Sequence, residues 1–346
     1  MRVVAFTSGW TVPSSRFRVR QFVASLEARG VTVSEHPSEP GKYDPVPFGV
    51  PKFLFDRKRL KSRTKWFDEA AGADVVWLER EFLVGRRSEE LSAGSAARRV
   101  FDVDDAIFLS GEKGYSEEIA AGCAGVIAGN SWLADHYRPH AKKVWIVPTA
   151  VDPADWAQRP DAPPKEGFVV GWTGTSANFR YLLEVEPALA ELLARHPDAK
   201  VRVVADAAPP WKGLPGAQVE FVRWTETAER EAVRGMSVGL MPLADEPWAK
   251  GKCAAKMLVY AAAAIPSVVT PVGVNGDILA KAEVGLAARA MAEWLGALEA
   301  LYSDRARVEA MGRAGEALVR EEYSVAVNAG RLAAIFEEVA EAARRG

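Results

Sequence analysis

The feature that most constrains the fold is a regular alternation of short apolar runs with segments of helical periodicity. This alternation predicts parallel strands joined by crossover helices, as in doubly wound α/β domains. The strands predicted in the first half of the chain are residues 2–6, 31–34, 74–78, 99–102, 125–128 and 144–147. Those in the second half are residues 168–171, 200–204, 219–221, 238–241, 267–270 and 285–287. Helical patterns such as residues 17–29 and 131–137 lie between strands.

The chain of 346 residues exceeds what one hydrophobic core usually supports, so two domains are expected. A Pro-rich polar stretch, residues 152–166, interrupts the periodicity and is interpreted as the linker between the two domains. We therefore predict two Rossmann-like domains, residues 1–155 and 166–324. The last segment, 325–346, is an amphipathic helical pattern, with apolar residues such as Leu332 and Phe336 at helical spacing.

Composition favours a cytoplasmic enzyme. The net charge of −2 gives no reason to expect nucleic-acid binding. Two distant cysteines, Cys123 and Cys253, suggest neither a disulfide framework nor a zinc site, which fits a reducing compartment. The first apolar run is too short for a signal peptide, and no apolar stretch approaches the roughly 20 residues that span a bilayer. Membrane contact, if present, is expected to be peripheral.

Two consecutive devices in the second half could hold an anion. Lys252 and Lys256 are four residues apart, so on a helix both ammonium groups would project from one face, as a diphosphate requires. After the strand at 267–270, the turn from Gly273 to Asp277 would place free backbone N–H groups at the start of the next helix. The alternative is a solvated lysine pair followed by an ordinary strand-turn-helix junction.

A further glycine-containing turn lies at the head of the second domain, where strand 168–171 runs into Gly171, Thr173, Gly174 and Thr175. The glycines would let the backbone approach a ligand, and the hydroxyls could donate to phosphate. The spacing differs from the Gly-x-Gly-x-x-Gly dinucleotide fingerprint, which argues against a nicotinamide enzyme.

The sequence resembles the retaining GT-B glycosyltransferases of the family-4 type (glycosyl transferases group 1). The segments that carry the resemblance are Gly-Lys-Cys-x-x-Lys at 251–256, Pro-Val-Gly-Val-Asn at 271–275, and residues 147–152, 169–175, 303–304, 311–315 and 322–324. The match is close in the second half and diffuse in the first 100 residues.

The resemblance implies two Rossmann-like domains facing a cleft, with the final helix packing back on the first domain. It implies transfer of a sugar, hexosyltransferase-like, from a nucleotide diphosphate sugar to an acceptor hydroxyl with retention, in glycan, polysaccharide or glycolipid synthesis. No cofactor and no metal are expected. The expected donor-binding residues are Gly171, Thr173, Gly174, Thr175, Lys252, Lys256, Gly273, Val274, Asn275, Gly276 and Asp277.

The chain departs from the family at two positions. Relatives carry Glu-x7-Glu across the lysine region, where this chain has Gly251 and Val259. Another carboxylate, Asp277 or Glu246, would then have to bind the nucleotide ribose. A nucleotide-sugar epimerase and a catalytically silent glycosyltransferase-like binding subunit remain as alternatives.

In the first domain, the strand at 99–102 ends in carboxylates, and strand ends are where α/β folds contact ligands. The resemblance places Asp104, with Asp105 beside it, near the transferred sugar as the catalytic candidates. The alternatives are that either residue caps the next helix or that the Asp-x-Asp pattern holds a metal. The resemblance also implies that the loop after the first strand, with Ser15 and Arg16, contacts the acceptor.

Residues 52–67 interleave seven basic residues with aromatic and aliphatic ones. Such a segment can dock on anionic lipid or grip a lipid-diphosphate acceptor. It can equally be a solvated helix with one buried apolar side.

Overall fold

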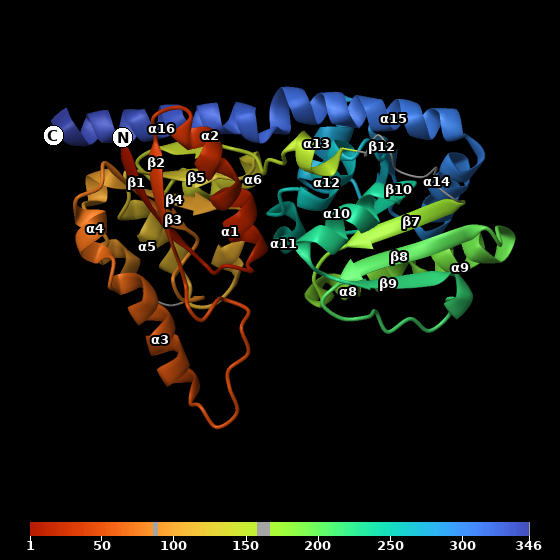
Figure 1. The fold of residues 1–346 in the computed structure, drawn as a ribbon, viewed down its shortest axis with the longest axis horizontal. Helices are drawn as coiled ribbons and strands as arrows, with labels where there is room; N and C mark the ends of the chain where they lie inside the picture. The colour runs from red at the N-terminus through yellow and green to blue at the C-terminus, as the bar shows by residue number, and fades with distance from the viewer. Residues whose placement is uncertain (86–88, 158–166, 346) are drawn as a thin grey trace. The chain divides into compact units, whose positions relative to one another are not determined.

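The computed structural model describes residues 1–85, 89–157 and 167–345, which form two units (Figure 1). Unit 1 contains Met1–Ala150, Lys250–Cys253 and the segment from Val325 onward, whereas unit 2 contains Val151–Ala249 and Ala254–Ser324. Each unit is built on a six-stranded parallel sheet. The predicted α/β class with two Rossmann-like folds is confirmed, and most of the predicted linker, residues 158–166, lies outside the described residues.

The sheet of unit 1 has the order β2-β1-β3-β4-β5-β6. Its strands are β1 (Arg2–Thr7), β2 (Thr32–Pro37), β3 (Val75–Glu79), β4 (Arg99–Val103), β5 (Gly125–Ala128) and β6 (Val144–Ile146). Its α-helices are α1 (Pro13–Arg18), α2 (Val23–Glu27), α3 (Lys52–Thr64), α4 (Phe67–Ala71), α5 (Tyr115–Ala121), α6 (Ser131–Tyr137) and α16 (Val325–Arg345). Short 3-10 turns are η1 (Arg20–Phe22), η2 (Glu89–Ser92), η3 (Ala96–Arg98) and η4 (Ile107–Leu109).

The central strands β3 and β4 are buried along their whole length and are mostly apolar, because both faces of the sheet are covered. Val3 and Ala5 of β1 point into a cluster shared with α2 and α16, whereas Val4 and Phe6 point into a cluster shared with α4 and α5. Helix α16 contributes eight buried side chains to the first cluster, including Phe336, whose ring meets that of Trp77 with centroids 5.1 Å apart. The final helix is therefore part of the core of unit 1.

The sheet of unit 2 has the order β12-β11-β10-β7-β8-β9. Its strands are β7 (Phe168–Thr173), β8 (Ala199–Ala205), β9 (Val219–Arg223), β10 (Val238–Met241), β11 (Ser267–Val269) and β12 (Gly285–Ala287). Its α-helices are α7 (Pro153–Trp156), α8 (Phe179–Leu182), α9 (Glu186–Arg195), α10 (Glu226–Arg234), α11 (Pro247–Lys250), α12 (Ala255–Ala262), α13 (Val274–Lys281), α14 (Met291–Ser303) and α15 (Arg305–Leu318). Shorter turns are η5 (Ser176–Asn178), η6 (Leu183–Val185), η7 (Gly216–Gln218) and the π-helical η8 (Val319–Tyr323).

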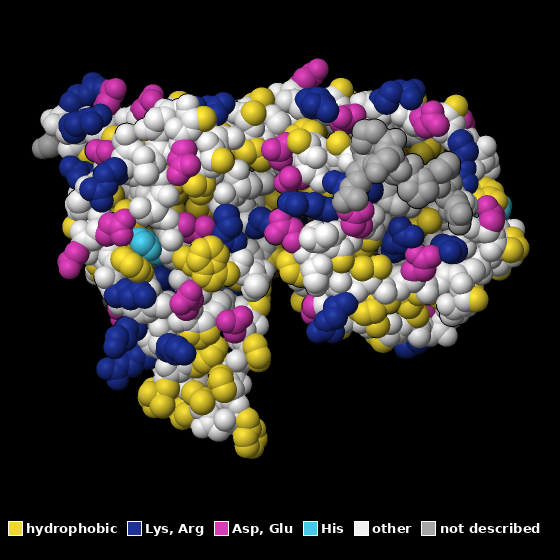
Figure 2. Space-filling view, in the orientation of Figure 1, with side chains coloured by type: hydrophobic (Ala, Val, Ile, Leu, Met, Phe, Trp, Pro, Cys, Tyr) yellow, Lys and Arg dark blue, Asp and Glu magenta, His cyan; other side chains and the backbone are white. Residues whose placement is uncertain are grey.

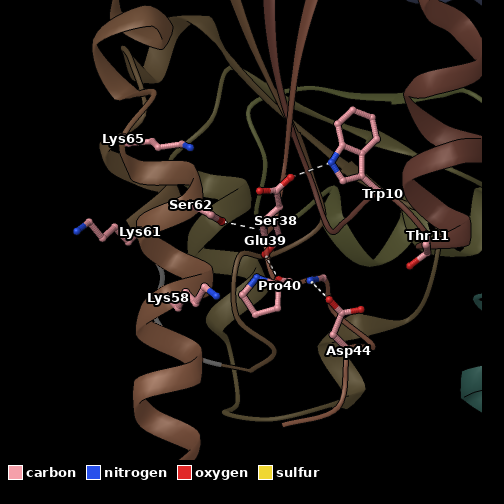
Figure 3. A pocket seen from close by; sticks show the side chains of 11 residues that line it. Trp10, Thr11, Ser38, Glu39, Pro40, Asp44, Lys58, Lys61, Ser62 and Lys65 are labelled. Carbon is pink, nitrogen blue, oxygen red and sulfur yellow. Dashed lines mark hydrogen bonds between the residues drawn. The ribbon is translucent and has the colours of Figure 1, made fainter. Parts of the chain in front are cut away.

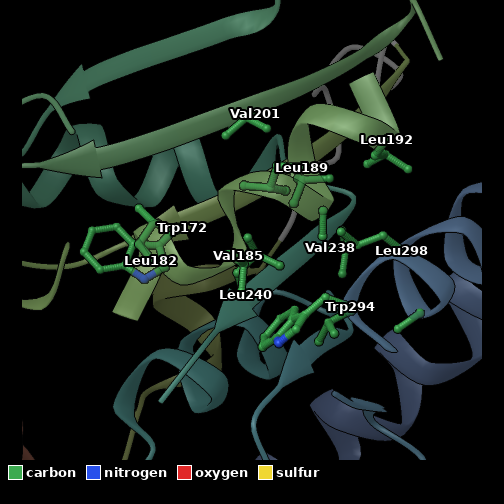
Figure 4. Close-up of a cluster of buried hydrophobic side chains, with 14 of the residues drawn as sticks. Trp172, Leu182, Val185, Leu189, Leu192, Val201, Val238, Leu240, Trp294 and Leu298 are labelled. Atoms are coloured by element: carbon green, nitrogen blue, oxygen red, sulfur yellow. The ribbon is translucent and has the colours of Figure 1, made fainter. Parts of the chain in front are cut away.

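One core cluster of unit 2 joins β7, β8 and β10 to α9 and α14 (Figure 4). Trp294 of α14 and Leu189 of α9 both point into it. These helices cover one face of the sheet. The loops at its carboxyl edge are therefore the part that can carry functional side chains.

All twelve predicted strands are present, eleven within two residues of their predicted bounds, and β2 ends three residues later than predicted. The single helix predicted over residues 17–29 is wrong, because the chain leaves the helical region at Val19, with φ −125° and ψ −65°. Arg18 and Arg20, on either side of this break, reach different partners, Asp102 and Glu35.

The strand order reverses once in each sheet, beside β1 and β3 in unit 1 and beside β7 and β10 in unit 2. Open α/β sheets bind ligands outside the carboxyl ends of strands at such switch points. The loops after these four strands are therefore where functional side chains are expected.

Candidate functional site

In unit 1, a buried ion-pair cluster lies at the carboxyl ends of β3 and β4. Arg80, directly after β3, donates to Asp104 (Nε to Oδ1, 2.6 Å) and to Asp105 (Nη2 to Oδ2, 2.8 Å). Burial would raise the pKa of Asp104, but the charge and hydrogen bond of Arg80 outweigh burial and hold that pKa below its ordinary value. Both catalytic candidates are thus oriented by one guanidinium.

Neither aspartate caps the next helical turn. No side chain caps η4, whose N-cap residue is Ala106, and the main-chain carbonyl of Asp105 accepts from the N–H of Ile107. The capping alternative is therefore wrong for this strand end. Asp102, two residues before Asp104, pairs with the buried Arg18 at 2.7 Å, yet burial still raises the pKa of Asp102.

Glu79 adds a second buried carboxylate to this edge of the sheet. Its Oε2 accepts from the N–H of Ser8 at 2.8 Å and from the hydroxyl of Ser15 at 3.1 Å, and burial raises its pKa. Ser15, an acceptor-side candidate, is thus buried and engaged with Glu79. Arg16, the other candidate, is half-buried with its guanidinium 4.4 Å from the ring centroid of Phe17.

The segment Lys250–Cys253 belongs to unit 1. The amide nitrogen of Asn130, the N-cap residue of α6, lies 3.1–3.3 Å from the carbonyl oxygens of Lys250, Gly251 and Lys252. The thiol of Cys253 lies 3.3 Å from the carbonyl oxygen of Asp104. Lys252 Nζ is 4.0 Å from Asp105 Oδ1, which adds a cation beside the ion-pair cluster.

Lys252 and Lys256 do not share a helix face, so that prediction is wrong. Helix α12 begins only at Ala255, and Ala254 before it is left-handed, with φ 54° and ψ 26°, a conformation that cannot continue an α-helix. The two lysines consequently belong to different units.

Close packing also explains the missing glutamate at position 251. A Cβ atom on Gly251 would lie 2.7 Å from the backbone nitrogen of Ala106, so no side chain fits there without a shift. Val259, the other departure, is buried in α12. Glu246, one substitute for the ribose contact, pairs with Arg180 at 2.6 Å, whereas Asp277 is exposed.

A pocket of about 540 Å³ opens in unit 1 beside the loops after β1 and β2 (Figure 3). The indole N–H of Trp10 donates to Glu39 at 3.0 Å, and Arg20 lies 4.8 Å from the indole ring centroid, so the aromatic surface is held in place. The charged lining comes from two carboxylates and from three lysines in or directly after α3, namely Glu39, Asp44, Lys58, Lys61 and Lys65. Such a lining suits a polar ligand that carries hydroxyl and anionic groups.

In unit 2, Lys256 lies against the turn after β7. Its Nζ is 5.2 Å from the ring centroid of Trp172, and a Cβ atom on Gly174 would lie 2.7 Å from Lys256 Cε. Gly174 therefore leaves room for a lysine stem beside the strand end. Thr175 is exposed next to it and accepts from the side chain of Asn178 at 2.9 Å.

Two other residues of this turn have structural contacts. Thr173 is buried and donates its hydroxyl to Glu229 at 2.7 Å. A Cβ atom on Gly171 would lie 1.9 Å from Met236 Sδ, so glycine is needed there for packing. Gly174, Thr175 and Lys256 are thus the donor candidates from this region that reach the loop surface.

The second predicted turn caps α13. Gly273 is its N-cap residue with φ 54° and ψ −135°, so the turn needs glycine, and the first helical residues are Val274, Asn275 and Gly276. Val274 and Asn275 are buried, and Asn275 donates its side-chain amide to the carbonyl of Thr270 at 3.1 Å. The side chains of this turn are therefore engaged in packing, and its candidate groups for an anion are the main-chain amides at the start of α13.

Sequence reasoning missed several groups at these edges. Glu79 and Arg80 directly follow an apolar strand, so strand-end reasoning could have found them as it found Asp104. Arg289 escaped notice because it follows a three-residue strand, yet it donates to the carbonyl of Pro271 at 3.1 Å beside the α13 turn.

Over residues 1–85, 89–157 and 167–345, no group of three or more His, Cys, Asp or Glu side chains is arranged to hold a metal ion. No helix in those ranges is long and apolar enough to cross a bilayer. 

Comparison with known proteins rests on structure, since no family model and no curated sequence matches the chain. Sucrose-phosphate synthase from Thermosynechococcus elongatus is similar with a TM-score of 0.71 at 13% identity, covering 98% of this chain and 99% of its own. HepE from Anabaena, in complex with UDP, gives 0.70 at 13% identity, covering 98% and 100%. WaaG, a glycosyltransferase involved in lipopolysaccharide biosynthesis, gives 0.65 at 14% identity, covering 97% and 99%. The chain therefore has the two-domain fold of the GT-B glycosyltransferases.

Proposed function

We propose that this protein is a glycosyltransferase that moves a sugar from a nucleoside diphosphate sugar to an acceptor hydroxyl with retention of configuration. The observation that carries the proposal is the anion-holding set of unit 2. Lys256, in the first turn of α12, lies against the turn at Gly174 after β7, and the N-terminal amides of α13 follow β11 of the same sheet. Structures with this fold include HepE with UDP and with UDP-glucose, so uridine nucleotides are the first donors to test.

In the proposed reaction, the acceptor oxygen bonds to the anomeric carbon as the bond from that carbon to the diphosphate breaks. The acceptor proton passes to a phosphate oxygen of the leaving diphosphate. The negative charge that grows on the diphosphate is stabilised by Lys256 and by the amides of α13. Unit 1 would supply acceptor and sugar contacts from Asp104, Asp105 and the pocket beside Trp10.

The decisive experiment is calorimetry with UDP in the presence of a chelator, followed by assays with UDP-sugars and NMR of the product anomer. Binding in chelator with a retained anomeric configuration would support the proposal. Loss of binding that magnesium restores would instead make Asp104 and Asp105 metal-ligand candidates.

Gly251 and Val259 keep the two alternatives open, because a ribose-binding glutamate is absent at both positions. Conversion of the UDP-sugar without any acceptor would identify an epimerase. Nucleotide binding with neither conversion nor transfer would identify a binding subunit. Placement in glycan, polysaccharide or glycolipid synthesis follows from which acceptor is used.

A further inference from the structure

An exposed apolar tip lies on unit 1, where the loop after β2 joins α3. Of the thirteen large hydrophobic side chains that are exposed in the described chain, six fall within residues 43–54. These six, the apolar tip, are Tyr43, Val46, Phe48, Val50, Phe53 and Leu54. Figure 2 shows a hydrophobic cluster at the end of the projection formed by α3 and this loop. Exposed hydrophobic side chains that gather in one patch, rather than being scattered singly, are typical of an interaction surface.

The backbone of the tip presents Phe48 outward. The N–H of Val50 donates to the carbonyl of Pro47 at 3.1 Å, which closes a tight turn with Phe48 and Gly49 at its centre. Gly49 has φ +79°, as the third residue of a type II turn requires. The side chain of Phe48 is fully exposed, at 107% of its reference area. A firmly turned loop thus holds an aromatic ring in solvent.

Basic side chains form a collar beside the tip. Residues 45–66 contain seven basic residues and one acidic residue, Asp56. The five exposed basic residues, the basic collar, are Lys52, Arg57, Lys58, Lys61 and Lys65. The acidic residue is buried and paired with Lys52 at 2.9 Å. Asp44, within the tip, is also exposed, but the five basic residues outnumber it, so the surface around the tip complements a negatively charged partner.

The spacing along α3 fits the layers of a bilayer surface. Phe53 and Leu54 lie in the first turn, and Arg57 lies four residues later, about 6 Å along the helix axis. Apolar groups at a membrane interface lie about 5–10 Å deep, below the head-group phosphates. The opposite face of α3, with Phe55, Arg59 and Arg63, is buried. The tip, rather than a helix face, is the part available for insertion.

We propose that the apolar tip inserts into an anionic lipid bilayer while the basic collar contacts the head-group phosphates. The tip explains insertion because exposed rings and aliphatic side chains gain by leaving water. The collar explains the preference for anionic lipid, since each lysine near such a surface strengthens binding. Docking needs neither donor nor acceptor, although Lys58, Lys61 and Lys65 of the collar also line the pocket beside Trp10.

The first test is sedimentation of the full chain with vesicles of equal parts phosphatidylglycerol and phosphatidylcholine, compared with phosphatidylcholine alone. We expect binding to the anionic vesicles and a loss of about tenfold or more for Phe48→Ser. Phe48 is fully exposed, so this variant should fold as the wild type does, which circular dichroism checks. Phe221→Ser, at a 41% exposed phenylalanine of unit 2, is the matched control and should bind as the wild type does.

The collar is tested with Lys58→Gln and Lys61→Gln, each expected to weaken binding about fivefold at low salt. Lys212→Gln, at an exposed lysine of unit 2, should leave binding unchanged. Absence of vesicle binding by the wild type would overturn the proposal. Binding that depends on the lysines but not on Phe48 would also overturn it, because adsorption would then occur without insertion.

A third measurement separates a bilayer from a protein partner. Both native cysteines are buried, so Val46→Cys offers one exposed thiol for an environment-sensitive dye. We expect the emission to shift to the blue with anionic vesicles, and a dye on Lys65→Cys to shift less. A dimer that Phe48→Ser converts to a monomer, without any shift on vesicles, would assign the tip to a protein interface instead.

Discussion

The two sheets each reverse their strand order once, so the carboxyl ends of their strands are arranged alike. The charged groups at these two edges, however, are arranged in opposite ways. In unit 1, Arg80 is buried among Asp104, Asp105 and Glu79, so its charge is matched inside the protein. In unit 2, the corresponding edge has glycine turns, helix amides and Lys256 beside the ring of Trp172, and its Arg180–Glu246 pair is largely exposed.

This difference shows two ways of preparing a charged site. A cluster built around one buried guanidinium orients its carboxylates before any ligand arrives. An edge of amides and glycine turns leaves negative charge to be supplied by the ligand. The first arrangement suits positioning of a sugar or an acceptor, and the second suits a diphosphate.

The largest expected effect is on folding, from Arg80→Met. Removing the guanidinium leaves the buried Glu79 and the partly buried Asp104 and Asp105 without their shared cation, which should cost about 3–5 kcal/mol. Arg180→Met in unit 2 removes a pair whose arginine side chain is 57% exposed and should cost less than about 1 kcal/mol. Urea denaturation measures both, and similar small losses would erase the contrast between the two edges.

The next effect is on turnover, from Asp104→Asn. We expect sugar transfer to fall by about 10²-fold or more, as for other positioned polar groups, with nucleotide affinity nearly unchanged. Asp102→Asn is the matched control, because Asp102 is also buried and paired with arginine but is engaged with Arg18 and Trp77. Equal losses of activity in both variants, in step with stability, would make Asp104 a structural residue.

A smaller effect concerns Lys256→Ala, which should weaken UDP binding about tenfold or more, as expected for a lost charge-assisted contact. Lys281→Ala, at an exposed lysine of unit 2 that pairs with Glu322, controls for net charge and should leave affinity unchanged. Lys252→Ala should also have less effect, because Lys252 lies beside Asp105 in unit 1. Calorimetry with UDP measures these affinities. Equal losses of affinity in the Lys252 and Lys256 variants would argue that both lysines belong to one nucleotide site.

The smallest effect is on acid stability. The folded-state pKa of Asp104 is lowered, so its ion pair stabilises the protein above the ordinary aspartate pKa, and that contribution is lost as pH falls through the lowered folded value. The stability difference between wild type and Asp104→Asn should therefore shrink between about pH 5 and pH 3. A difference that stays constant over this range would show that Asp104 has the same pKa in the folded and the unfolded protein, because stability depends on pH only where the two states bind different numbers of protons.

The strands were predictable because each is a short apolar run that both faces of a parallel sheet bury. The geometry of the site was harder to predict, because helical periodicity alone placed Lys252 and Lys256 on one helix face. The left-handed Ala254 separates them, and no sequence pattern marks an alanine for that conformation. Asp104 was found from its strand-end position, but its partner Arg80 lies on a different strand, and pairing across a sheet is set by tertiary packing.

Helix α16 sets an order of events during synthesis. Its eight buried side chains complete the core of unit 1, yet they are made about 175 residues after Ala150. At about 5–20 residues per second, this delay is roughly 10–35 s. Throughout that interval one apolar face of the nascent first sheet, including the ring of Trp77, lacks the part of its cover that α16 supplies. A ribosome stalled after residue 324 should therefore hold a chain that chaperones bind, whereas release of the final helix should end that binding.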